Sequence, residues 1–461
     1  MGPNKMKKTL LLFGLLLLGC FKIDAQSNLT LYQSKLVPQS TTINPGFIPK
    51  TNVNIGLPVI SGISFSFANA FSFNDVKEGI VDFPDRLQPV NYLTFESSID
   101  LLHIGFRVKQ SYLSLSIQEK ISAVYSYPSD LFRLVIDGNG GEFLGQTISL
   151  DGFGINFNHY REYAVSYARP ITRKLTIGAR AKYLYGMENV YTEQSELGIT
   201  TIDDPEQNYP IVIDGKAVIH TSGINAVFDN RISEYMDTLS SVDGLINYNT
   251  GKNNHGYGVD IGFNYELNKR LSFSAAINDF GSITWNDQNR SLKNENINFR
   301  FEGIDFNEFI SGGGSDTAVQ RLLDSLNAAF ALEESQEAYT TPLTPKVYGG
   351  VRFNFTKNQA IGATTFFQFV PGSIRPALSL SYEINARKWL GFTTNYTIMS
   401  RSYTNLGVGL VARVRAIQMY LLTDNALAVM FPNGARNTSL RFGFNVIFGR
   451  KESYTFAKIR T

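Results

Sequence analysis

Fourteen stretches of this chain alternate apolar and polar side chains with a period of two. In the last of them, "SLRFGFNVIF", Leu440, Phe442, Phe444, Val446 and Phe448 share one face, because successive side chains of a β-strand point to opposite faces. An even number of such strands brings both ends of a sheet to the same side. We predict strands at 53–67, 99–109, 112–126, 158–170, 174–187, 256–267, 271–281, 345–355, 359–370, 376–386, 389–399, 405–414, 417–430 and 438–448.

The polar faces of these stretches are rich in Gly, Ser and Asn and carry isolated charges, as in "YGVDIGFNYEL". A soluble sandwich turns its polar face to bulk water, where long charged side chains are frequent, so this composition favours a crowded, partly wet interior. Short turns such as "YELNKRLSFS" join some strands, whereas residues 188–255 and 282–344 are long loops, an asymmetry typical of outer-membrane barrels. We predict an all-β chain with a single closed antiparallel transmembrane β-barrel of about 14 strands over residues 53–448. A soluble sandwich of two stacked sheets is the alternative.

The N-terminus has the organisation of a secretory signal peptide. Three lysines precede the apolar run "TLLLFGLLLLGCF", and a basic start, an apolar core of roughly 7–15 residues and a small residue before the cut define such a signal. We predict that residues 1–25 are the signal peptide and that cleavage follows Ala25, which removes the single cysteine. A lipoprotein signal that keeps Cys20 is the alternative. Either signal predicts export, and export together with the barrel predicts a location in the outer membrane of a Gram-negative bacterium.

Composition and spacing argue against several classes of function. A formal net charge of +2, without a basic run, disfavours nucleic-acid binding. The four histidines show no paired spacing, so we predict no metal site and no cofactor. No catalytic residues are predicted, and a hydrolase whose residues meet only in space is a remote alternative. An apolar stripe predicts a helix at 317–332, which packs locally or serves as a lid or a partner-binding helix.

The predicted strands also place charged side chains on their polar faces. Because an unpaired buried charge is expensive, we expect these side chains to pair with each other or with a plug, and they disfavour a wholly apolar tunnel. Residues 26–52 contain three prolines and cannot form a central strand, so we predict that this segment is an N-terminal plug inside the barrel. The predicted lumen-facing charges are Arg107, Arg180, Lys182, Asp260, Arg352 and Glu383.

The last strand resembles the C-terminal signal recognised by the outer-membrane assembly machinery. That signal has a polar residue, a glycine, alternating hydrophobic residues and a final aromatic residue. In this chain thirteen residues follow the aromatic residue, and we predict that 449–461 form a periplasmic tail. The outer face of the barrel would contact outer-membrane lipid. The residues that match the signal are Arg441, Gly443, Phe444, Val446 and Phe448.

The stretch "TINPGF" resembles the Asn-Pro-Ala/Gly stretch at the start of fatty-acid-transporter-like (FadL-like) barrels, and the match covers Asn44, Pro45 and Gly46. Pro45 fixes its own backbone and restricts Asn44, so we predict that these three residues form a fixed turn of the plug under the barrel wall. The resemblance implies fourteen strands and an N-terminal segment folded inside the barrel. It also implies a relation to transporters of hydrophobic molecules and to PorV-type components of type IX secretion. Three longer stretches, "VPQSTTINPGF", "YPSDLFRLVIDGN" and "TPLTPKVYGGVRF", are similar to an uncharacterised family of exported bacterial barrels.

Two functions therefore remain open for a non-enzymatic barrel. The first is passage of a small hydrophobic or amphipathic molecule, which predicts an apolar pocket near the long loops and a gap or kink in the wall. The second is a role as a component or partner of a type IX-like secretion system, which predicts a protein partner at the loops and no continuous solute path.

Overall fold

The computed structural model describes residues 28–80, 82–138, 140–207, 209–224, 242–301, 333–387, 389–399 and 402–449. The predicted signal peptide at 1–25 and the predicted helix at 317–332 lie outside the described residues, as does the predicted tail beyond residue 449. These three features stay predictions.

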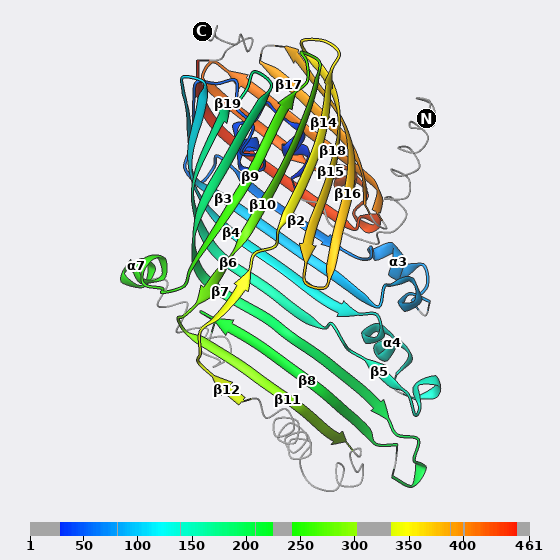
Figure 1. The fold of residues 1–461 in the computed structure, drawn as a ribbon. Helices are drawn as coiled ribbons and strands as arrows, with labels where there is room; N and C mark the ends of the chain where they lie inside the picture. Colours follow the sequence, from blue (N-terminus) through cyan, green and yellow to red (C-terminus); the bar gives the residue numbers. More distant parts are fainter. Residues whose placement is uncertain are drawn as a thin grey trace, which may run out of the picture.

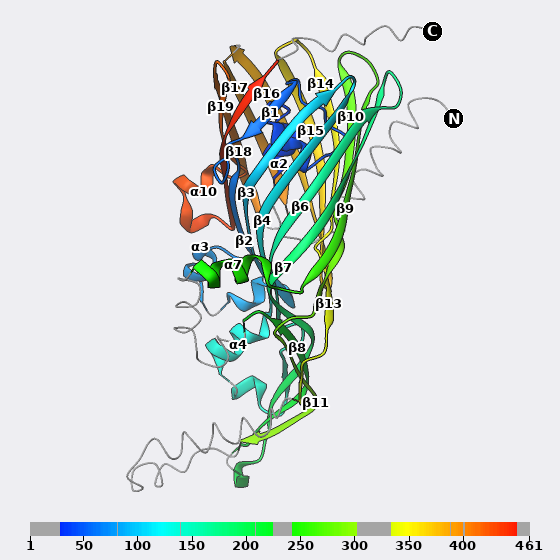
Figure 2. The same cartoon turned by 90° about the vertical axis from the view of Figure 1, so that its left-hand side faces the viewer.

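The strands close into one antiparallel barrel of 14 strands (Figures 1 and 2), which confirms the predicted fold class and strand count. The first strand consists of two pieces, and both pieces pair with the last strand on one side and with β3 on the other. In order around the ring, the strands are β1 (Val53–Gly56) with β2 (Ile63–Asn69), β3 (Val90–Val108), β4 (Ser111–Pro128), β6 (Gly154–Pro170), β7 (Leu175–Thr201), β9 (His255–Glu266), β10 (Leu271–Trp285), β14 (Lys346–Asn354), β15 (Gln359–Val370), β16 (Ser373–Arg387), β17 (Leu390–Met399), β18 (Ser402–Val414), β19 (Ile417–Thr423) and β20 (Asn437–Phe448).

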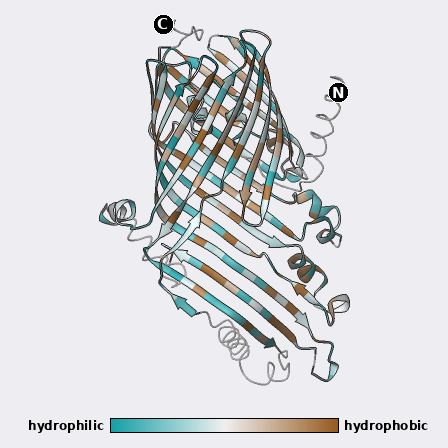
Figure 3. Cartoon of the chain, in the orientation of Figure 1, coloured by the Kyte–Doolittle hydropathy of each residue, from teal (hydrophilic) through white to brown (hydrophobic). Residues whose placement is uncertain are grey.

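The outer surface of the barrel is apolar and the inner surface is polar. On β9, Ile261 and Phe263 are 53% and 41% exposed, whereas Asp260 between Val259 and Ile261 is buried. On β16, Leu380 is 54% exposed beside a buried Ser379. Brown and teal bands alternate along the strands in Figure 3, as expected when one face meets the lumen and the other does not.

The two ends of the barrel differ. At one end, which we call the turn end, short hairpin turns such as 171–174 and 267–270 join the strands. At the other, the loop end, the short helices gather (Figure 2). They are α3 (Phe73–Lys77), α4 (Asp130–Asp137), α7 (Val242–Thr250) and α10 (Leu427–Met430), with the 3₁₀ turns η2 (Pro84–Arg86), η3 (Gly141–Phe143), η4 (Pro205–Gln207) and η5 (Pro432–Gly434). In the described part of the chain, no helix has both the length and the apolarity to cross a membrane.

The first strand was wrongly predicted as one continuous run over 53–67. Residues 57–62 leave the ladder: Gly56 pairs with Asn445 and Ile63 pairs with Phe442, so six residues oppose only two residues of β20. Pro58 has no N–H for a ladder hydrogen bond, and Val59 adopts a positive φ of 68°. The wall therefore has an interruption in its first strand.

The prediction of long loops at 188–255 and 282–344 was also wrong in part. Strand β7 continues past the barrel to Thr201 and pairs there with β8 (Ile211–Ser222), which pairs with β11 (Asn289–Phe301). Three short strands, β5 (Thr147–Ser149), β12 (Glu333–Ser335) and β13 (Tyr339–Pro342), add to this sheet, which extends beyond the loop end (Figure 1). Most residues of β8 and of the continuation of β7 are only partly buried, and the polar run "YTEQSE" of β7 interrupts the alternation by which the barrel strands were predicted. The predicted strand 417–430 likewise ends at Thr423, and α10 follows it.

Candidate functional site: a closed lumen

The N-terminal segment of the described chain lies inside the barrel. Residues 28–49, which we call the plug segment, contain the short helix α2 (Leu29–Gln33) and the 3₁₀ turn η1 (Pro38–Thr42). In Figures 1 and 2 this dark blue segment lies within the ring of strands. Every residue of both elements is buried. Three prolines and polar side chains keep the segment out of the sheet, so it fills the space that a barrel of this size leaves between its walls.

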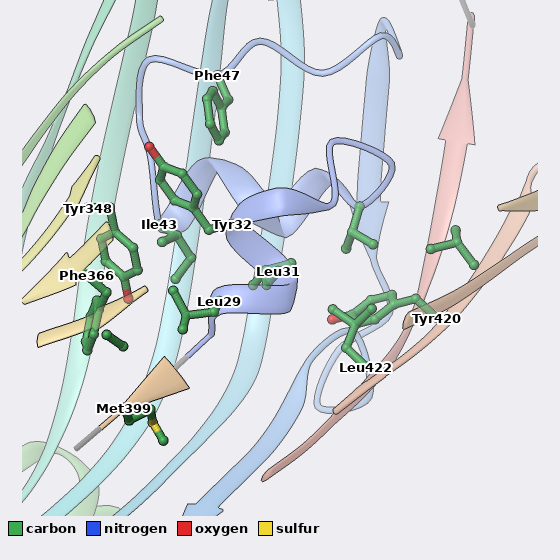
Figure 4. Close-up of a cluster of buried hydrophobic side chains, with 13 residues drawn as sticks. Leu29, Leu31, Tyr32, Ile43, Phe47, Tyr348, Phe366, Met399, Tyr420 and Leu422 are labelled. Carbon is green, nitrogen blue, oxygen red and sulfur yellow. The ribbon is translucent and has the colours of Figure 1, made fainter. Parts of the chain in front are cut away.

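Apolar side chains hold the plug segment to one side of the wall (Figure 4). Tyr32 stacks on Tyr348 of β14, with ring centroids 5.0 Å apart. Burying one such large side chain contributes roughly 1.5–3 kcal/mol. The cluster joins Leu29, Leu31, Tyr32, Val37, Ile43 and Phe47 of the plug segment to Tyr348, Phe366, Ala377, Met399, Val411, Tyr420 and Leu422 of the wall.

Hydrogen bonds tie the plug segment to strands around the ring. Near the loop end, the Thr30 hydroxyl donates to Asp424 Oδ1 at 2.7 Å and accepts from Asn395 Nδ2 at 2.7 Å. Near the interruption of the first strand, the Gln39 and Asn445 amides exchange two hydrogen bonds of 2.7 and 3.0 Å. Gln39 also donates to the carbonyl oxygen of Ser61 at 3.1 Å. The polar inner faces of the strands thus satisfy groups that water cannot reach.

The turn at Asn44, Pro45 and Gly46 lies against the backbone of the wall. Asn44 Oδ1 accepts from the Gly46 N–H at 2.8 Å, which closes the turn on itself. Asn44 Nδ2 donates to the carbonyl oxygens of Phe263 on β9 and Ala275 on β10, at 3.3 and 3.2 Å. The three residues at which the sequence predicts a fixed turn thus form a turn that contacts the wall directly.

Two glycines of the wall form the seat for this turn. Gly178 of β7 and Gly262 of β9 are paired directly across the ladder. A Cβ atom at Gly178 would collide with the carbonyl oxygen of Pro45, and one at Gly262 would collide with the Asn44 side chain. Both glycines are required here because the chain approaches the wall more closely than any side chain allows.

Beyond the plug segment, on the side of the loop end, lies a chamber of about 110 Å³, which we call the polar chamber after the charged side chains that line it beside apolar ones such as Leu31 and Leu422. Four of the residues that line it, Lys120, Arg180, Lys182 and Asp279, belong to a network of buried charges that is neutral as a whole. Arg180 bonds Glu162 at 2.5 Å, and Lys182 bonds Asp260 at 2.5 Å. Each charge has a partner of opposite sign, which offsets the several kcal/mol that removing an ion from water costs. The network consists of Lys120 (β4), Glu162 (β6), Arg180 and Lys182 (β7), Asp260 (β9) and Asp279 (β10).

On the other side of the plug segment, at the turn end, lies a larger pocket of about 400 Å³. Gly46, Phe47 and Ser40 of the plug segment line it, whereas Thr30, Thr42 and Ile43 line the polar chamber. The plug segment therefore lies between two separate cavities of the same lumen.

All six predicted lumen charges are on the inner side of the wall. Arg180, Lys182 and Asp260 belong to the buried network, as described above. Arg352 bonds Glu383 at 2.6 Å and the carbonyl oxygen of Gln33 at 3.3 Å. Arg107 donates to the carbonyl oxygen of Pro49 at 2.5 Å. Two of the six, Arg107 and Arg352, thus bond the plug segment directly.

Sequence reasoning missed the other half of the network. Lys120 is two residues from the buried Gln118 on β4, and Glu162 is two residues from the buried Tyr160 on β6, so the alternation of each strand places both side chains on the inner face. This alternation could have predicted them from the sequence. Asp279 gave no such signal. It lies at a β-bulge between Ile277 and Phe280, with a φ of 58°, and the bulge turns its side chain into the lumen.

The residues of the predicted assembly signal lie on β20. Phe444, Val446 and Phe448 share the outer face of that strand, whereas Arg441 is buried on the inner face. Arg441 Nε donates to Asn28 Oδ1 of the plug segment at 3.2 Å, and a Cβ atom at Gly443 would collide with the Ser61 carbonyl oxygen. Their recognition by the assembly machinery stays a prediction. Among the described residues, no three His, Cys, Asp or Glu side chains gather closely enough to hold a metal ion.

Comparison with known proteins finds similar solved structures and one matching sequence family. No curated protein matches the chain. Among solved structures, the Ralstonia pickettii toluene transporter TbuX is 9% identical, with 90% of this chain and 95% of that chain covered and a TM-score of 0.42. The Pseudomonas putida toluene transporter TodX is 9% identical, with 93% and 98% covered and a TM-score of 0.39. A Pseudomonas aeruginosa FadL homologue is 8% identical, with 93% and 100% covered and a TM-score of 0.42.

The resemblance to an uncharacterised family, noted in the sequence, is confirmed. Residues 45–424 match the family of unknown function DUF5723. The matched range begins at the turn of the plug segment and ends just after β19, so it covers most of the chain. The chain therefore belongs to the family DUF5723.

Proposed function

We propose that this chain is an outer-membrane barrel that passes small amphipathic molecules, and that the plug segment must move for them to pass. The observation that carries this proposal is the position of the plug segment between two cavities of one lumen. The polar chamber, at about 110 Å³, is well below the roughly 300–1,000 Å³ of pockets that hold a small-molecule ligand. The described conformation is thus a closed one.

The outer surface supports a location in a membrane. In hydrocarbon no water can pair with the backbone, so a strand protein must close its sheet, and this barrel has no free edge. Its outward residues form an apolar belt that includes Val165, Ile261, Ile361, Leu380, Leu410 and Leu421. A barrel of this kind in a bacterium belongs to the outer membrane.

The lining of the lumen favours amphipathic over wholly apolar solutes. The cavity nearest the loop end has buried ion pairs and hydroxyl groups, and so it differs from the apolar pocket that a purely hydrophobic solute would need. Tyr420 and Gln39 face the interruption of the first strand, and both donate to the carbonyl oxygen of Ser61. A solute with one polar and one apolar part matches this mixture of partners.

A role in protein secretion is the second candidate, and the sheet extension favours it. Strands β7, β8 and β11 continue beyond the barrel and carry a surface that a solute channel does not need (Figure 1). The two functions differ in their loss phenotypes. A deletion strain that keeps solute uptake but loses secreted proteins would support secretion and contradict transport.

The outer-membrane location makes a prediction about depth in the wall. Leu380 is in the middle of β16, whereas Val414 is the last residue of β18 and borders a turn. Arginine at Leu380 is expected to lower the free energy of unfolding by about 2–4 kcal/mol, and Val414→Arg by only about 0–1 kcal/mol, because lipid solvates charge poorly at the midplane. Urea unfolding of both variants in lipid vesicles measures the difference. Equal losses at the two sites would contradict a lipid-facing belt.

Solute flux tests the proposed transport. Proteoliposomes containing the intact chain are expected to take up benzenesulfonate and benzyltrimethylammonium, whose fixed charges slow diffusion through lipid, faster than protein-free liposomes do. Glucose, which has no apolar part, is the matched polar solute and is expected to enter more slowly. Uptake of all three at the protein-free rate would contradict the proposal.

A further inference from the structure

We propose that the pocket at the turn end is a binding site for a small anionic amphiphile, a phosphate or carboxylate group on a short apolar chain. The pocket lies at the mouth of the barrel, between the plug segment and the hairpin turns at 109–110 and 171–174. With a volume of about 400 Å³, it lies within the roughly 300–1,000 Å³ that small-molecule sites occupy. The inference is independent of the proposed transport, since it concerns binding to the closed barrel.

The charge of the lining determines the sign of the ligand. Glu266 is the one carboxylate among the described residues that line the pocket. The lining contains six cations, Lys35, Lys50, Arg107, Lys109, Arg173 and Lys174. This imbalance contrasts with the neutral network on the other side of the plug segment. A concave site lined by one sign of charge focuses its field and attracts ions of the opposite sign.

Lys35 is the cation that the plug segment itself contributes to the lining of this pocket, before its last turn. Its side chain is half-buried on the plug segment, and its Nζ donates to Asn264 Oδ1 at 3.1 Å. Nζ also lies 4.8 Å from the centre of the Phe47 ring. In the described part of the chain, no carboxylate lies within ion-pair distance of Lys35. An ammonium group has three donors, so Lys35 keeps donors for an anion without breaking an ion pair.

Apolar groups supply the second half of the site. Phe47 and Ile48 of the plug segment line the pocket together with Pro49 and Pro170. Phe47 is buried, whereas Lys50, Arg173 and Lys174 are exposed. The pocket thus has a buried apolar part and cations that are more exposed. A ligand with an anionic head and a short apolar chain can contact both. An inorganic anion alone would leave the apolar part without a partner.

The test is calorimetric titration of the full chain in nanodiscs of zwitterionic lipid. Hexyl phosphate is expected to bind, inorganic phosphate to bind at least about tenfold more weakly, and hexyltrimethylammonium not to bind. The double variant R173E/K174E is expected to weaken hexyl phosphate binding by about tenfold or more, because it reverses two charges of the lining. Raising the salt concentration should weaken the binding as well.

The matched control is K269E/R270E. These residues form the tip of the neighbouring hairpin turn and carry the same charges at the same end of the barrel, yet they do not line the pocket. This control is expected to keep the hexyl phosphate affinity. Nanodiscs with added phosphatidylglycerol distinguish the source of the anion: competition with hexyl phosphate identifies a lipid headgroup, and unchanged binding identifies a soluble ligand. Equal binding of the anionic and cationic probes, or equal losses in the two double variants, would overturn the inference.

Discussion

A chain that lacks residues 27–46 is expected to form a steadily conducting channel in a planar bilayer. Residues 28–46 lie in the lumen between the polar chamber and the turn-end pocket, so their removal joins the two cavities. The barrel itself should remain folded, because its ladder closes through β20 and the first strand without any residue of the plug segment. The deleted chain should still migrate on a gel as a compact, heat-modifiable barrel.

The intact chain, inserted from the same detergent, is the control for this measurement, and its mean conductance should stay far below that of the deleted chain, because its lumen opens only when the plug segment moves. Folding is checked on the same preparation, so a failure to fold is separated from a failure to conduct. A folded deletion variant whose conductance equals that of the intact chain would refute closure by the plug segment.

The second large effect is expected at the glycine seat. Gly262→Ala places a methyl group where the Asn44 side chain lies, and overpacking of this kind costs typically about 1–3 kcal/mol. The variant is also expected to expose the plug segment to added protease, because the turn at Asn44, Pro45 and Gly46 can no longer rest on the wall. Urea unfolding and the rate of cleavage before residue 47 measure the two consequences.

Gly258 provides the matched control on the same strand and the same inner face. A Cβ atom there would meet its nearest neighbour, the Lys182 side chain, at 3.5 Å, which is an ordinary contact. Gly258→Ala should therefore change stability by about 0.5 kcal/mol or less and leave protease resistance unchanged. If the two variants behave alike, the turn does not depend on its seat.

The barrel was predictable from sequence because a strand between lipid and lumen has two different faces. That contrast appears as strict alternation in "YGVDIGFNYEL" and "RFGFNVIF", and it fixed the strand count. It weakens where both sides of a strand meet water. The continuation of β7, with "YTEQSELGITT", has polar residues on both faces and only Leu197 and Ile199 as aliphatic side chains, so the sheet extension was predicted as loop.

The site was predictable only in part, for a similar reason. The prolines of the N-terminal segment and the inward parity of Arg180 and Asp260 were visible in sequence. The pairing of Gly178 with Gly262 depends on the register between β7 and β9, which a single sequence does not encode locally. Asp279 reaches the network only because a bulge breaks the alternation of β10.

The most direct test of whether the plug segment must move for a solute to pass is to tether it to the wall. In a chain carrying Cys20→Ser, cysteines at Thr30 and Asn395, whose side chains are hydrogen-bonded at 2.7 Å, can be joined by a short bismaleimide that a reductant cleaves. Benzenesulfonate uptake into proteoliposomes is expected to fall to the protein-free rate when the tether is closed and to recover after cleavage. In the Thr30→Cys single variant, treatment with the bismaleimide should leave the rate of uptake unchanged. Uptake that continues at the same rate with the tether closed would contradict the account.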